Sequence, residues 1–194
     1  MRRVRISPRP GVRTLAELVA EARAYADAAL RATGSVRPTM LALTPRGVLA
    51  HYPEQLADED DKDRFAVECR FLLVATAATA SAMVLESWMV VDRPGEDILS
   101  TAPSESPHRI EIVTICAETR TENRFLMLPI RRTTLGLYAG LGEDAAPAGL
   151  TTQGRFSGMF PTRKLRSKDT EMARTALAAL DVEIADEGSP FSQN

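Results

Sequence analysis

The 194-residue sequence predicts an α+β fold in which an antiparallel sheet of about five strands packs against helices. Three observations carry this prediction: a capped amphipathic helix near the N-terminus, a hairpin signal directly after it, and three strand-like apolar segments in the second half. A composition of 44% hydrophobic and 26% charged residues is typical of a globular chain. The length corresponds to one domain, with or without extensions.

The first helix is predicted over residues 14–33. Thr14 and Glu17 have the spacing of a capping box, in which the hydroxyl and the carboxylate each accept a hydrogen bond from a backbone amide. Gly34 is the expected stop. Apolar residues recur between these ends at the spacing of one buried helix face: Leu15, Leu18, Val19, Ala22, Tyr25, Ala26, Ala29 and Leu30.

A hairpin is predicted next. Its strands are residues 39–43 and 48–52, and the segment 44–47 joins them. In that segment Pro45 occupies the second position and Gly47 the fourth, as in a type I turn. Pro53 ends the returning strand because proline cannot donate to a strand ladder.

An acidic cluster predicts the start of a second helix, and apolar stretches predict the remaining strands. A cluster of carboxylates around residues 58–63 favours the start of a helix over about 60–80. Strands are predicted over 82–91, 109–117 and 123–132, and a short one over 135–141. The order of elements resembles that of roadblock, longin and profilin-like proteins.

The sequence divides into five segments: a basic arm (1–13), an α+β core (14–141), a Gly/Pro-rich basic loop (142–168), a closing helix (169–182) and a polar tail (183–194).

The sequence disfavours a secreted, a membrane-spanning, a disulfide-bonded and a zinc-binding protein. No apolar stretch suits a secretory signal, and the longest uncharged run, 71–85, is too short to cross a bilayer. Cys69 and Cys116 stand 47 residues apart, with neither a disulfide framework nor a zinc motif. We therefore expect a cytoplasmic protein with no membrane partner and no cofactor.

The long loop over 92–108 and its flanks form the best candidate site. We expect Glu86, Glu105, His108 and Glu111 to converge at one end of the sheet. Such a cluster could hold a divalent metal or act as acid and base, which would make the chain a metal-dependent hydrolase. The alternative, which we favour, is structure or recognition: Arg109 and Glu111 share a strand face and would anchor the loop, with Trp88 in the core.

This same stretch carries one family resemblance. The segments Glu86-Ser87-Trp88 and Pro103-Ser104-Glu105-Ser106-Pro107-His108-Arg109-Ile110-Glu111 resemble an uncharacterised group of bacterial and phage hypothetical proteins. The resemblance covers about residues 60–140. It implies a phage or mobile-element origin and no particular activity.

Two basic segments could contact a polyanion. Arginines precede the first acidic residue, Glu17, and a second group lies in a stretch without acids between Asp144 and Asp169. Either group could bind phosphates, or be a solvated tail and loop, and the net charge of -2 gives no long-range attraction to nucleic acid. The candidate binding residues are Arg2, Arg3, Arg5, Arg155, Arg163, Lys164 and Arg166, together with Arg109 of the loop.

The leading hypothesis is a non-enzymatic interaction module that acts as a subunit of a larger protein or nucleoprotein assembly. Its sheet edge, its long loop and its basic ends would supply the contacts. The partner would be another protein or a second copy of the chain, with nucleic acid as a further possibility. No metal is expected in this interpretation.

Overall fold

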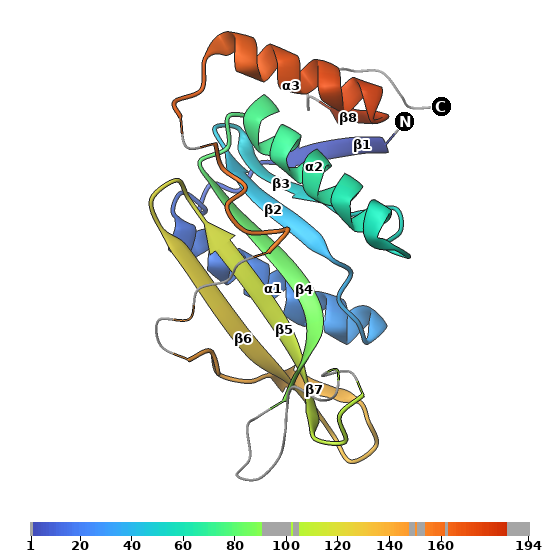
Figure 1. Cartoon of the computed structure of the whole chain (residues 1–194). Helices are drawn as coiled ribbons and strands as arrows, with labels where there is room; N and C mark the ends of the chain where they lie inside the picture. The colour runs from blue at the N-terminus through green and yellow to red at the C-terminus, as the bar shows by residue number, and fades with distance from the viewer. Residues whose placement is uncertain are drawn as a thin grey trace, which may run out of the picture.

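A computed structural model describes residues 2–90, 102, 105–147, 150, 154–161 and 163–185. The described residues form three helices and eight strands around one sheet (Figure 1). In chain order the elements are β1 (Arg2–Ser7), α1 (Leu15–Thr33), β2 (Thr39–Thr44), β3 (Gly47–His51), α2 (Glu59–Ala75), β4 (Ala80–Val90), β5 (Arg109–Glu118), β6 (Asn123–Arg132), β7 (Tyr138–Leu141), α3 (Ser167–Ala179) and β8 (Val182–Ala185).

The sheet has the strand order β7-β6-β5-β4-β2-β3-β1-β8. All neighbours are antiparallel except β1 and β8, which run parallel. The longest contact is between β4 and β5, where ten pairs run from Ser81 opposite Glu118 to Val90 opposite Arg109. This pair forms the long central ribbon from which the rest of the sheet extends.

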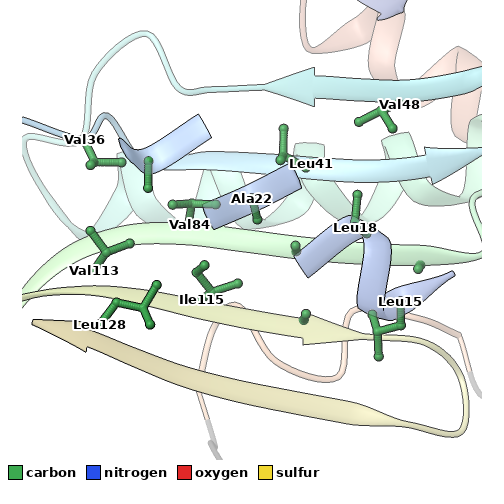
Figure 2. Close-up of a cluster of buried hydrophobic side chains, with 14 of the residues drawn as sticks. Leu15, Leu18, Ala22, Val36, Leu41, Val48, Val84, Val113, Ile115 and Leu128 are labelled. Carbon is green, nitrogen blue, oxygen red and sulfur yellow. The ribbon is translucent and has the colours of Figure 1, made fainter. Parts of the chain in front are cut away.

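Helix α1 covers one face of the sheet. Its capping box is formed as predicted, with Glu17 N donating to Thr14 Oγ1 and Thr14 N donating to Glu17 Oε2. Gly34 ends the helix in the left-handed region, at φ 79°. Figure 2 shows its apolar face against the strands. This core contains Leu15, Leu18, Ala22, Ala26 and Leu30 of the helix and residues of β2 to β6 such as Leu41, Val84, Val113, Ile115 and Leu128.

Helices α2 and α3 cover the other face, over β1, β2, β3 and β8 (Figure 1). Phe65, Cys69, Leu72 and Leu73 of α2 and Leu177 of α3 fill the second core. The helices therefore lie on opposite faces and are offset along the sheet. The C-terminal half of β4 and the start of β5 extend beyond the end of α1.

The sheet has eight strands where about five were predicted, so the roadblock- and profilin-like order is not reproduced. The predicted basic arm contains β1, whose buried Val4 and Ile6 alternate with Arg3 and Arg5. Its main partner is β8, from the predicted closing helix and tail, with Arg2 opposite Val182. This pairing joins residues 180 positions apart, and such non-local contacts leave little signal in local patterns.

The predicted loop over 142–168 is tied down where it is described. It contains no helix or strand there before Ser167. The Glu118 carboxylate accepts hydrogen bonds from the backbone of Gly158 and Met159, and Arg70 donates to the Arg155 carbonyl. Phe156 packs edge-on against Phe65 of α2, with ring centroids 5.7 Å apart. This segment is thus part of the fold rather than a solvated loop.

Candidate interaction site

The end of the sheet at the bottom of Figure 1 carries the predicted site residues that flank the long loop: Glu86, Glu105, His108, Arg109 and Glu111. Here β4 ends, β5 begins and β6 turns into β7. In the register of β4 and β5, Trp88 lies opposite Glu111 and Glu86 lies opposite Val113. Val113 belongs to the core under α1. Because side chains alternate along a strand, Glu86, Trp88, Arg109 and Glu111 all lie on the face that α1 covers further along.

Trp88 is on the surface, not in the core as predicted. It is 37% exposed, and the Arg109 guanidinium lies over its ring, 4.8 Å from the centroid. This geometry is a cation–π contact, which holds the ring in one orientation. An open depression of about 540 Å³ surrounds the pair, lined by Trp88, Ser106, Pro107, Arg109, Ile110, Glu111, Ile130 and Arg132.

Glu111 forms its ion pair across the sheet with β6. Its Oε2 lies 2.5 Å from Nε of Arg132, and both side chains are partly exposed. Glu111 therefore does not form the Arg109 pair that the sequence suggested, although the two residues share a face as expected. The Glu111–Arg132 pair fixes the rim of the depression between β5 and β6.

A tight turn beside this rim presents two leucines to solvent. Thr133 N donates to the Leu137 carbonyl at 2.8 Å, and Gly136 N donates to the Thr133 carbonyl at 2.9 Å. Gly136 has φ 77°, a conformation that favours glycine. At the tip Leu135 is 83% exposed and Leu137 is 64% exposed. We call Trp88, Arg109, Glu111, Arg132, Leu135 and Leu137 together the Trp88 surface.

The carboxylates of the predicted metal cluster do not come together. Glu86 accepts a hydrogen bond from the Val36 backbone at 2.8 Å, so it fixes the chain between α1 and β2. Glu105 and His108 lie in the turn before β5, where His108 N donates to Ser106 Oγ. No three His, Cys, Asp or Glu side chains of the described residues are grouped as a metal site requires. Among the described residues the arrangement supplies no ligand set for the hydrolase alternative, and most of the predicted 92–108 loop lies outside the described residues.

Four of the candidate nucleic-acid residues are neutralised by acids. Arg155 pairs with Glu59 and Asp63 of α2, although its own stretch of sequence lacks acids. Arg163 pairs with Asp169, which holds the pKa of that carboxyl well below its usual value. Arg2 and Arg3 pair with Glu68 and Glu183. Arg5, Lys164 and Arg166 lie on β1 and in the segment before α3, apart from the Trp88 surface.

A second polar arrangement, missed at the sequence level, lies between α2 and the sheet. Glu68 is only 1% exposed. One carboxylate oxygen accepts from His51 Nε2 at 3.0 Å, and the other accepts from Arg2 and from Arg64, the latter at 3.1 Å. Arg64 also donates to the Leu180 carbonyl at the end of α3. We call Glu68, His51, Arg2 and Arg64 the Glu68 cluster; it connects β1, β3, α2 and α3.

Burial and hydrogen bonding act in opposite directions on Glu68. Burial raises the pKa of its carboxyl, while the bonds from His51 and Arg2 lower it more strongly, to about 2. The carboxylate therefore stays ionised inside the protein. His51 also packs against Phe65, with ring centroids 5.4 Å apart. The positions of these four residues in the sequence gave no signal that they converge.

No family model, curated protein or solved structure matches this chain. The resemblance to uncharacterised bacterial and phage proteins therefore stays a prediction. Among the described residues, none of the helices has the length and apolar character needed to cross a membrane.

Proposed function

We propose that the chain is a non-enzymatic interaction module that binds another protein through the Trp88 surface. The single observation that carries the proposal is the exposed Trp88 ring held under Arg109, next to a hydrogen-bonded turn that presents Leu135 and Leu137. Tryptophan and arginine are enriched among the residues that dominate protein–protein binding energy.

The Trp88 surface has the arrangement of an interface centre with a polar rim. A large aromatic ring whose orientation is already fixed loses little entropy when a partner covers it. The Glu111–Arg132 pair lies beside it and supplies hydrogen-bonding groups. The two leucines add apolar area that water covers in the free chain. These features favour a partner with an apolar pocket and polar groups around it.

The other functions considered from the sequence receive less support. The ion pairs of Arg2, Arg3, Arg155 and Arg163 leave less positive charge for phosphates than the sequence suggested. The candidate hydrolase residues do not form a group. Cys69 is a buried free thiol, which suits the reducing compartment that we propose for this protein.

Site-specific photo-crosslinking tests this function. A photoreactive amino acid is placed at Leu135 and, as a matched control, at Val67, which is an exposed apolar residue of α2. We expect one partner protein to crosslink at position 135 in cells and not at position 67. A product containing only a second copy of the chain would make the module a homo-oligomer. Equal products at the two positions, or none at 135, would contradict the proposal.

A further inference from the structure

The opposite edge of the sheet carries a separate groove. Strand β8 is the last strand in the order of the described sheet, and it pairs with β1 on its inner side. Helix α3 precedes β8 and packs along it (Figure 1). Between them lies a hollow of about 290 Å³. It is lined by Arg46, Arg174, Leu177, Ala178, Val182, Glu183 and Ile184.

The lining combines an apolar floor with positive charge. Leu177 and Val182 are buried residues of the core under α2 and α3, and Ile184 packs partly against the same core. Arg174 of α3 contributes a guanidinium group. The one carboxylate of the lining, Glu183, is already paired with Arg3 at 3.3 Å. The positive charge of Arg174 therefore complements an acidic ligand.

The backbone along the outer edge of β8 could also take part in binding. An edge strand presents backbone amides and carbonyls that can pair with another extended chain. In β-augmentation such pairing provides affinity, and pockets for alternate side chains provide specificity. Here the overhanging α3 would cover one face of an added strand, and the apolar floor would accept one of its side chains.

We propose that an acidic, extended segment of a partner protein binds in this groove as a strand added to β8, with its carboxylate at Arg174. The inference does not depend on the Trp88 surface, which lies on strands at the other side of the sheet. It assigns the module a second contact, specific for a β-forming acidic segment.

A synthetic peptide tests the groove directly. The probe is a capped hexapeptide of alternating valine and threonine that carries one glutamate, and its control carries lysine in place of the glutamate. Amide shifts of the ¹⁵N-labelled full chain report binding. We expect the acidic probe to shift the amides of 182–185 and the lysine probe to bind more weakly. Arg174→Glu should weaken binding by about five- to tenfold, because a favourable exposed charge pair becomes a repulsive one.

Two control variants test whether the effect is specific to Arg174 and to this groove. Arg120→Glu changes the same charge in the exposed turn between β5 and β6 and should leave the affinity unchanged. A chain carrying both Leu135→Ser and Leu137→Ser should bind the peptide normally, which separates this groove from the Trp88 surface. Equal affinity for the two peptides, or no shift at 182–185 at millimolar probe, would overturn the proposal.

Discussion

His51 Nε2 lies 3.0 Å from Glu68 Oε2, and both side chains are buried between α2 and the sheet. With Arg2 and Arg64 on the other carboxylate oxygen, this one acid joins the N-terminal strand, the hairpin and two helices. Arg2, Arg64 and His51 all bond to the Glu68 carboxylate, which indicates a structural role for this residue. The Glu68 cluster thus links Arg2 of β1 and the Leu180 carbonyl, which precedes β8, to α2 and β3.

Removing this carboxylate should destabilise the fold. Glu68→Ala leaves Arg2, Arg64 and His51 without their shared acceptor, so we expect the free energy of unfolding to fall by about 2–3 kcal/mol. Urea denaturation followed by circular dichroism measures the change. Glu171→Ala, which removes an exposed acid of α3, is the matched control and should change stability by less than about 0.5 kcal/mol. Equal midpoints for the two variants would refute a stabilising role for Glu68.

The same residue predicts a loss of stability in acid. The pKa of the Glu68 carboxyl falls from its usual 4.5 to about 2 in the folded chain. The unfolded chain therefore binds a proton at a higher pH than the folded chain does, and stability decreases as the pH falls from 4.5 towards 2. Urea midpoints measured across this range should fall less steeply for Glu68→Gln than for the wild type. Parallel pH profiles would contradict this assignment.

Trp88 is the single tryptophan of the chain, so its fluorescence reports on the Trp88 surface alone. Acrylamide should quench it readily in the free protein, since the ring is 37% exposed. Arg109→Ala should increase quenching because it uncovers one face of the ring. A ring inaccessible to acrylamide in the wild type would contradict the exposed orientation on which the proposed function depends.

Nucleic acid should not bind through the basic segments. Because Arg2, Arg3, Arg155 and Arg163 are paired with acids, few phosphates could be neutralised. Fluorescence polarisation with single- and double-stranded DNA and RNA at low salt should show no binding. Salt-dependent binding whose slope decreases in an Arg155→Ala variant would instead restore the nucleoprotein alternative.

Local signals predicted much of this fold. The capping box of α1 and the span of β6 agree with the sequence, as does the turn before Gly47. Strands β1 and β8 were not predicted. In β1, Val4 and Ile6 alternate with arginines, but so short an alternation within a basic segment is also compatible with a solvated arm.

The site was predicted only in part. Arg109 and Glu111 could be placed on one face from their spacing, but the choice of Arg132 as partner depends on the register of β5 and β6.

The measurement that tests the central claim most directly is the affinity of the crosslinked partner for three chains, determined by isothermal titration calorimetry. Relative to the wild type, Trp88→Ala should weaken binding at least about tenfold, because truncating a central aromatic contact removes a dominant share of the interface energy. Met172→Ser, an exposed apolar position on α3, should bind as the wild type does. Equal affinities for Trp88→Ala and the wild type would contradict the assignment of the Trp88 surface as the binding site.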